Sequence, residues 1–463
     1  MKMIICSVLT TVVLSLVVST VFAAESVAVA RPTIAKICTN CHKAEAGTLR
    51  GTFDSVAFKS KTIQIKIDDS IELVKFDEDD IKVVNGAGKA GDGELLRGTK
   101  KGHELKVVFV EENGVKTAVK VFEKPPVKVT PDMVITTGEI EKLVAGGPDK
   151  GSSYLFDSRP LPRFKEGAIV TAVSLPYPTF DTQVDKLPAD KNALIIFYCS
   201  GPTCNMSPGS ADKAKKLGYR NVKVYIDGMP AWSKKNFSVL SAASLKEAWL
   251  DKNIPLVLLD TRLEKTAAKG FIKGAVAFPV AQAAKMVKKL TLKQKNAPIF
   301  VYDAAGGTEA ETVARELIKG GYENIKVVTG GFAAWKGATF AVETGKLSHT
   351  ATYTPAPRPG EIKLAEFEAY AANLPDNVMI IDVRNVDEVK SGMLKTARVI
   401  PAEEIKNRLA EIPKDKLIVT QCSTGIRAEM AYHALRELGY TNVKFVNAKI
   451  EFEKNGSYKI NKE

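Results

Sequence analysis

The pattern of apolar positions repeats three times over most of the chain. In each repeat an apolar strand ends in Asp-x-Arg, and a second apolar strand leads into a loop of small residues. An alanine-rich helical stretch ending in Gly-Tyr follows, and then another β-rich run. Apolar strands that alternate with helices predict parallel sheets covered on both faces, so the expected fold class is α/β. The Asp-x-Arg strands lie at 155–159, 258–262 and 380–384.

Each repeat is as long as a whole domain, whereas solenoid repeats span only about 20 to 50 residues. We therefore expect three tandem α/β domains. Between the second and the third, Pro355, Pro357 and Pro359 predict a semi-rigid extended linker. The expected units are 132–239, 240–341 and 361–454, with the linker at 342–360.

Ahead of the repeats, apolar and polar residues alternate with a period of two. Residues 105–110 show this pattern clearly, and Asn113-Gly114 follows them as a turn signal. Pro125-Pro126 ends the pattern, because prolines resist both helix and strand pairing. We therefore expect a small all-β module at 47–126, in front of the three domains.

The N-terminus has the composition of a secretory signal. Lys2 precedes an apolar run at 4–22, which ends in the small residues Ala23 and Ala24. We expect cleavage of residues 1–24, with an uncleaved membrane anchor as the alternative because the run approaches the length of a spanning helix. No later stretch could cross a bilayer, so no membrane span is expected after cleavage. The expected location is the periplasm, either free or associated with the outer membrane.

The charge of the chain bears on its partners. The 463 residues carry a formal charge of +13, from lysines spread along the whole sequence. No arginine-rich arm or aromatic-interleaved basic stripe is present, so nucleic acid is not an expected partner. A solvated basic surface explains the charge, and attraction of small anions is the alternative.

Five cysteines lie beyond the signal. An odd number outside the cytoplasm leaves at least one thiol without a partner in the chain, so we expect reactive chemistry and not a disulfide framework. These cysteines are Cys38, Cys41, Cys199, Cys204 and Cys422.

Cys422 lies in the loop with the strongest chemical signal. It ends a strand, and the short loop after it leads into a helix, so backbone N–H groups and the helix start stabilise a thiolate or persulfide there. Gly425 permits backbone torsions that a side chain forbids. Arg427 offers several donors to an oxyanion. The alternative is an inert core cysteine at a strand end.

The Asp-x-Arg strand, the Cys-x-x-Gly-x-Arg loop and the Gly-Tyr turn resemble a rhodanese domain. The resemblance implies a sulfurtransferase of the thiosulfate sulfurtransferase type. Cys422 would accept a sulfane sulfur, hold it as a persulfide and pass it to a nucleophile, while Arg427, Gly425 and Thr424 would bind the substrate. The family's closing Gly-Gly-x-x-x-Trp is absent from the third unit, where 447–450 takes its place.

The first and second units carry altered loops. In the first, Cys199 directly follows the strand and aligns with the family's nucleophile, while Cys204 could resolve a persulfide by forming a disulfide. This loop resembles a known Cys-x-Gly-Pro-x-Cys variant, and a static structural disulfide is the alternative. In the second unit Asp303 takes the place of the cysteine. A carboxylate forms no persulfide, so we expect this unit to be a scaffold or docking module.

The segment at 25–46 carries a different chemistry. Cys38 and Cys41 have the spacing that attaches haem c, and His42 beside them would be the axial ligand. A zinc site or a redox dithiol is the alternative. The resemblance to a c-type cytochrome is local, because β-rich sequence follows. His103 is the candidate for the sixth ligand, with a lone surface histidine as the other interpretation.

Together these features predict an enzyme. We expect a periplasmic sulfur or selenium transferase that acts on small sulfur- or selenium-containing anions and exchanges electrons with partner cytochromes through haem. The overall plan resembles rhodanese-like proteins of selenite and tellurite reduction systems in metal-reducing bacteria. The alternative is a noncatalytic electron-transfer or docking component that uses its rhodanese folds as interaction surfaces.

Overall fold

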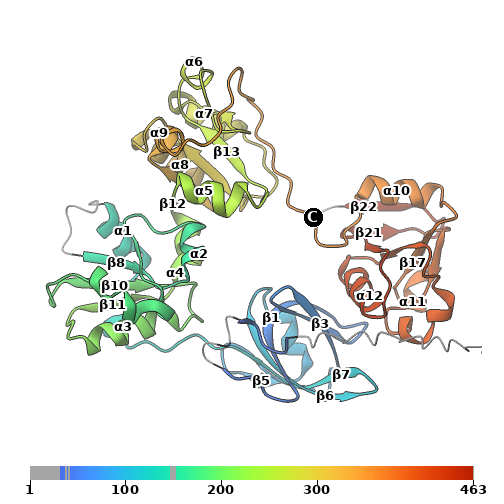
Figure 1. Cartoon of the computed structure of the whole chain (residues 1–463). Helices are drawn as coiled ribbons and strands as arrows, with labels where there is room; N and C mark the ends of the chain where they lie inside the picture. The colour runs from blue at the N-terminus through green and yellow to red at the C-terminus, as the bar shows by residue number, and fades with distance from the viewer. Residues whose placement is uncertain (1–31, 37–38, 40–41, 146–152, 462–463) are drawn as a thin grey trace, which may run out of the picture.

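The computed structural model describes residues 32–36, 39, 42–145 and 153–461. Figure 1 shows four bodies along the chain, a β module followed by three units in which helices pack on a sheet. Within these described residues, no helix is long and apolar enough to cross a membrane. The predicted signal at 1–24 and the thiols of Cys38 and Cys41 lie outside the described residues.

Residues 48–123 form a sheet of seven strands in the order β3-β2-β1-β6-β7-β4-β5, and β3 also pairs with β7. This extra pairing closes the first five strands of the order into a ring around an apolar interior. Asn113 and Gly114 both have positive φ, as the predicted tight turn between β6 and β7 requires. The strands are β1 (Thr48–Ala57), β2 (Thr62–Ile67), β3 (Ser70–Phe76), β4 (Lys82–Val84), β5 (Ala90–Gly91), β6 (Glu104–Glu112) and β7 (Val115–Glu123).

The first α/β unit has a parallel sheet in the order β11-β10-β8-β9. Its strands are β8 (Ser153–Asp157), β9 (Val173–Ser174), β10 (Leu194–Tyr198) and β11 (Val222–Tyr225). Its helices are α1 (Thr137–Ala145), α2 (Leu161–Lys165), α3 (Met206–Lys216) and α4 (Gly228–Lys235).

The second unit has a parallel sheet in the order β12-β16-β15-β13-β14. Its strands are β12 (Ser238–Ser241), β13 (Val257–Asp260), β14 (Val276–Ala277), β15 (Ile299–Tyr302) and β16 (Ile325–Thr329). Its helices are α5 (Ala242–Leu245), α6 (Glu264–Ala267), α7 (Ala283–Lys289), α8 (Thr308–Lys319) and α9 (Gly331–Gly337).

The third unit has a parallel sheet in the order β18-β17-β19-β20 and a separate antiparallel hairpin, β21-β22. Three tandem parallel-sheet domains are thus confirmed. The strands are β17 (Val378–Asp382), β18 (Ala397–Val399), β19 (Leu417–Gln421), β20 (Val443–Phe445), β21 (Lys449–Phe452) and β22 (Tyr458–Asn461). The helices are α10 (Leu364–Ala372), α11 (Val386–Val389) and α12 (Ile426–Glu437).

The segment predicted as a linker at 342–360 is in part attached to the second unit. Glu343 and Phe271 exchange backbone hydrogen bonds of 2.9 and 2.8 Å, and Leu347 is buried. The free linker therefore begins later than predicted, because the start of this segment completes the apolar core of the second unit.

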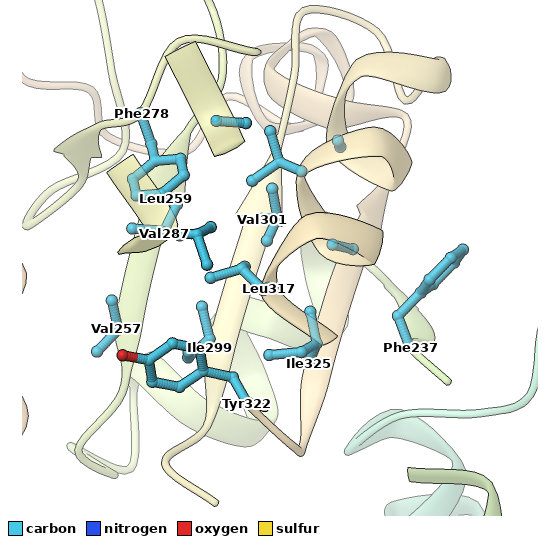
Figure 2. Close-up of a cluster of buried hydrophobic side chains, with 14 of the residues drawn as sticks. Phe237, Val257, Leu259, Phe278, Val287, Ile299, Val301, Leu317, Tyr322 and Ile325 are labelled. Carbon is cyan, nitrogen blue, oxygen red and sulfur yellow. The ribbon is translucent and has the colours of Figure 1, made fainter. Parts of the chain in front are cut away.

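The second unit shows how the strands and helices share a core. Its apolar side chains gather between the sheet and helices α7 and α8 (Figure 2). Leu259 from β13, Val301 from β15 and Leu317 from α8 are all fully buried. Because parallel strands covered on both faces bury nearly every side chain, their sequences are continuous apolar runs.

We expect Leu317→Ala to destabilise the second unit by about 2–5 kcal/mol, because the lost methyl groups leave a cavity that the packed core fills only in part. Hydrogen exchange of the backbone amides of β15 and α8 measures this free energy. Leu263→Ala is the matched control, since Leu263 is 68% exposed and its truncation is expected to change stability by less than about 0.5 kcal/mol. Equal effects of the two substitutions would contradict the assigned core.

Candidate functional site

The Asp-x-Arg signature forms a buried ion pair. Asp382, at the end of β17, accepts hydrogen bonds from Nε and Nη2 of Arg384, the latter at 2.6 Å, and Nη2 also donates to the carbonyl of Gly392 at 2.8 Å. The pair ties the strand end to the turn after α11. The same arrangement recurs in the other units, with the residues Asp157, Arg159, Gly167 and Asp260, Arg262, Gly270. The signature is therefore structural: it fixes the backbone on which each loop rests.

Cys422 lies in the loop between β19 and α12. Its side chain is buried, and the backbone N–H of Gly425 donates to the sulfur at 3.2 Å. Gly425 has φ +84, and a Cβ there would lie about 3.1 Å from the carbonyl oxygen of Val446. Only glycine therefore satisfies both the torsion and the close approach, which lets the N–H point at the sulfur.

Arg427 pairs with a carboxylate of its own unit, whereas the sequence predicted that its donors bind substrate. Both terminal nitrogens donate to the carboxylate of Glu388, each at 2.7 Å. Burial opposes the charge of Glu388, but the Arg427 guanidinium outweighs it and lowers the pKa of that carboxyl to about 2. Arg427 thus stands beside the loop with its donors already engaged, and its contact with substrate stays a prediction.

Glu388 also links the loop to the β module. Lys59, in the turn between β1 and β2, lies 3.4 Å from the Glu388 carboxylate. A second contact joins Lys406 to the carbonyl of Asn113 at 2.9 Å. Sequence reasoning missed Glu388 and Lys59, since nothing in either local sequence marks them as partners of a loop far along the chain.

A hollow of about 480 Å³ lies over the Cys422 loop. Thr424 and Gly425, both predicted to bind substrate, line it from the third unit. Asp54 and Lys101 of the β module line it from the other side and pair with each other at 2.5 Å. The wall of this hollow is thus built by two separate parts of the chain.

The third unit replaces the family's closing helix with a strand. In the first unit, the N–H of Met229 in α4 donates to the carbonyl of Cys199 at 3.0 Å. In the third unit, the N–H of Ile450 in β21 donates to the carbonyl of Ser423 at 2.9 Å. In both units a backbone N–H from the following element thus bonds a carbonyl of the loop. In the third unit β21 provides this bond in place of the missing motif.

The first unit holds two free thiols in one loop. Cys199 is fully buried, its sulfur lies 3.1 Å from the hydroxyl of Ser207, and it donates to the carbonyl of Cys204 at 3.4 Å. Burial raises the pKa of Cys199 well above its ordinary value. Cys204 is only half-buried. A hydrogen bond from Cys199 lowers the pKa of Cys204 to about 6, and backbone N–H groups of Ser200 and Met206 add to the effect against the opposing influence of burial.

Asp303 fills its own loop in the second unit. One carboxylate oxygen accepts from the N–H of Ala305 at 3.0 Å and from that of Gly306, and the other accepts from Ala310 at 3.2 Å. The carboxylate therefore takes up the amides that surround the sulfur in an active loop. The loop of the second unit thus holds a carboxylate by its backbone N–H groups, and the role of the unit as a scaffold stays a prediction.

His42 borders a hollow of about 440 Å³. Phe122 and Pro125 give this hollow an apolar wall, while Arg50 and Lys124 add cations. Glu104, Glu123, Lys106 and Lys128 line it too, so the hollow offers apolar contact and charge of either sign, and a haem there stays a prediction. Within the described part of the chain, no three His, Cys, Asp or Glu side chains group as a metal site.

His103, the predicted sixth ligand, is exposed and its Nδ1 lies against a carboxylate oxygen of Glu123. Glu123 in turn lines the hollow beside His42. Glu123 thus contacts His103 and borders the same hollow as His42, and a role of either histidine as a haem ligand stays a prediction.

The fold and the loops define a class of protein. In each of the three units, a parallel sheet carries a loop at the C-terminal end of a central strand. A cysteine begins this loop in the first and third units, and Asp303 takes its place in the second. The family model of the rhodanese-like domain matches residues 136–235, 241–338 and 366–451. The chain therefore belongs to the rhodanese-like family.

Known relatives match single units of the chain. A sulfurtransferase of Allochromatium vinosum is 35% identical over 68 residues, 15% of this chain and 64% of that protein. A tRNA sulfurtransferase of Shewanella piezotolerans is 33% identical over 88 residues, 18% of either chain. The chain thus spans less than two thirds of the length of these relatives. The crystal structure of thiosulfate sulfurtransferase from Pseudomonas aeruginosa is similar at 18% identity and a TM-score of 0.21, covering 71% of this chain and 69% of that one.

We expect the alkylation of Cys204 by iodoacetamide to be half-maximal near pH 6, because the thiolate is the reactive form and a lowered pKa provides it at lower pH. Peptide mass spectrometry across a pH series measures the rate. Cys199 is expected to stay unmodified over the same range. In the unfolded chain both thiols should react with a midpoint near the ordinary value of about 8.5. A native midpoint at that ordinary value for Cys204 would contradict the assigned hydrogen bonds.

Proposed function

We propose that this protein is a periplasmic rhodanese-type sulfurtransferase that carries a sulfane sulfur, or a chemically similar selenium atom, on Cys422. The observation that carries the proposal is the N–H of Gly425 directed at the buried Cys422 sulfur beneath an accessible hollow. The similarity to sulfurtransferases supports the same activity. Its substrates are small sulfur- or selenium-containing anions.

The geometry of the loop explains the transfer. The Cys422 sulfur attacks the sulfane sulfur of the donor, and the remainder of the donor leaves with the electron pair of the broken bond. The persulfide carries negative charge on its outer sulfur, and the loop amides stabilise it as they stabilise the Asp303 carboxylate in the second unit. Arg427, held by Glu388, adds positive charge beside the loop.

The proposal includes a haem c attached at Cys38 and Cys41, with His42 and His103 as axial ligands. Haem supplies one-electron chemistry when bound. The lining of the hollow at His42 supports this assignment, and Asn205, next to Cys204, borders the same hollow. His42 and Asn205 thus border one hollow, and we propose that partner cytochromes exchange electrons near it. Reduction of selenite or tellurite is the process that we propose for the whole chain.

We expect Cys422→Ser to lower thiocyanate production from thiosulfate and cyanide strongly, because an alkoxide cannot form the persulfide. Asp303→Asn is the matched control at the equivalent position of the second unit, and its activity should equal that of the wild type. The measurement is steady-state turnover of the full chain. If Cys422→Ser leaves the turnover unchanged, this loop is not the transferase site.

We expect protein made in a haem-attaching periplasm to show a c-type α band on reduction. The double variant Cys38→Ser, Cys41→Ser should lose both the band and the added mass of haem, while Cys199→Ser should keep them. Visible spectra and intact mass provide the two measurements. Wild-type protein without the band, produced alongside a control cytochrome that does mature, would rule out the cofactor.

A further inference from the structure

The loop of the first unit separates its two thiols by environment. Cys199 directly follows β10, is fully buried, and has its sulfur within reach of the Ser207 hydroxyl and the Cys204 carbonyl. Cys204 precedes α3 and is half-buried. Of the two cysteines, Cys204 is therefore the more exposed to an incoming donor.

The hydrogen bonds have a direction that sets the charges. Cys199 donates to the Cys204 carbonyl, which requires a proton on the Cys199 sulfur. The neighbouring Cys199 thiol and the backbone N–H groups of Ser200 and Met206 lower the pKa of Cys204 to about 6, which favours a negative charge on its sulfur. Lys124, from the end of the β module, adds a nearby cation.

We propose that Cys204 is the attacking thiolate of the first unit and Cys199 its resolving thiol, so that this unit reduces a sulfane sulfur to sulfide. The sequence pattern alone assigns the opposite order, because Cys199 takes the position of the family's nucleophile. The inference rests on the proposed sulfurtransferase chemistry of the chain and adds a second activity at a separate loop.

The chemistry balances in two steps with thiosulfate as the donor. The Cys204 thiolate attacks the outer sulfur, the sulfur–sulfur bond of thiosulfate breaks, and sulfite leaves with its electron pair. The Cys199 sulfur then attacks the Cys204 sulfur, a disulfide forms, and the outer sulfur leaves as hydrosulfide with the electron pair and the Cys199 proton. The two cysteines lose two electrons and the sulfane sulfur gains them.

A reductant of the dithiol class returns the disulfide to two thiols by ordinary exchange. Cys199 and Cys204 lie five positions apart in one loop, and the Cys199 sulfur lies 3.4 Å from the carbonyl oxygen of Cys204. The second step therefore needs only a local shift of the loop. In the third unit, by contrast, Cys422 is the only cysteine of the loop, so its persulfide is available for transfer.

The test is a single turnover of the full chain in the Cys422→Ser background, without oxygen or reductant, in excess thiosulfate. With both loop thiols present we expect sulfite and sulfide in equal amounts and a Cys199–Cys204 disulfide. The further variant Cys199→Ser should release sulfite alone and keep one added sulfur on Cys204, located by peptide mass spectrometry. The further variant Cys204→Ser should release neither product. Circular dichroism confirms that each variant is folded.

A persulfide on Cys199 in the Cys204→Ser protein would overturn the assigned order. Accumulation of a stable persulfide on Cys204 with Cys199 intact, and no sulfide, would overturn the resolving role. Neither result would affect the function proposed for Cys422, which thiocyanate formation by the Cys199→Ser, Cys204→Ser protein measures separately. If this protein forms no thiocyanate while the dithiol reaction of the first unit is unchanged, the function proposed for Cys422 is refuted. The roles assigned to Cys204 and Cys199 are then unaffected.

Discussion

Negative charge held by backbone N–H groups, at the point where a strand gives way to a helix, is the interaction on which the chemistry of this chain depends. The three units present it in three forms. In the third unit, the N–H of Gly425 donates to the sulfur of Cys422. In the second, the carboxylate of Asp303 accepts the same kind of bonds. In the first, the amides act on Cys204, six positions beyond the end of β10. Similar loops thus carry the sulfur of Cys422 in the third unit, the carboxylate of Asp303 in the second and the thiol of Cys204 in the first.

The buried Asp–Arg pairs keep this arrangement in place. Each aspartate is fully buried and each arginine nearly so, and the guanidinium also bonds a backbone carbonyl of the next turn. Removal of one partner from such a pair typically costs about 3–5 kcal/mol, because the other charge is left without compensation in the interior. The most repetitive feature of the sequence thus ties the end of each Asp-x-Arg strand to a following turn.

The β module contributes residues to the hollow over the Cys422 loop of the third unit. Lys59 contacts the Glu388 carboxylate that holds Arg427, and Asp54 and Lys101 line the hollow over the Cys422 loop. The module carries the opposite hollow as well, between His42 and the start of the first unit. The module therefore lines one hollow together with the Cys422 loop and another together with Asn205 of the first unit.

The sequence by itself determined the tandem order of the domains, the parallel sheets and the position of each loop, because continuous apolar runs and small-residue loops are local patterns. It also identified Asp303 as the substituted member. Only the tertiary structure decided the partner of Arg427, since Glu388 lies on a different helix and comes near through packing. It likewise decided which thiol of the first unit is protected, because the burial of Cys199 and the amides around Cys204 depend on how the loop folds back on α3. Local sequence records residue types, whereas burial and hydrogen-bond partners arise when distant segments meet.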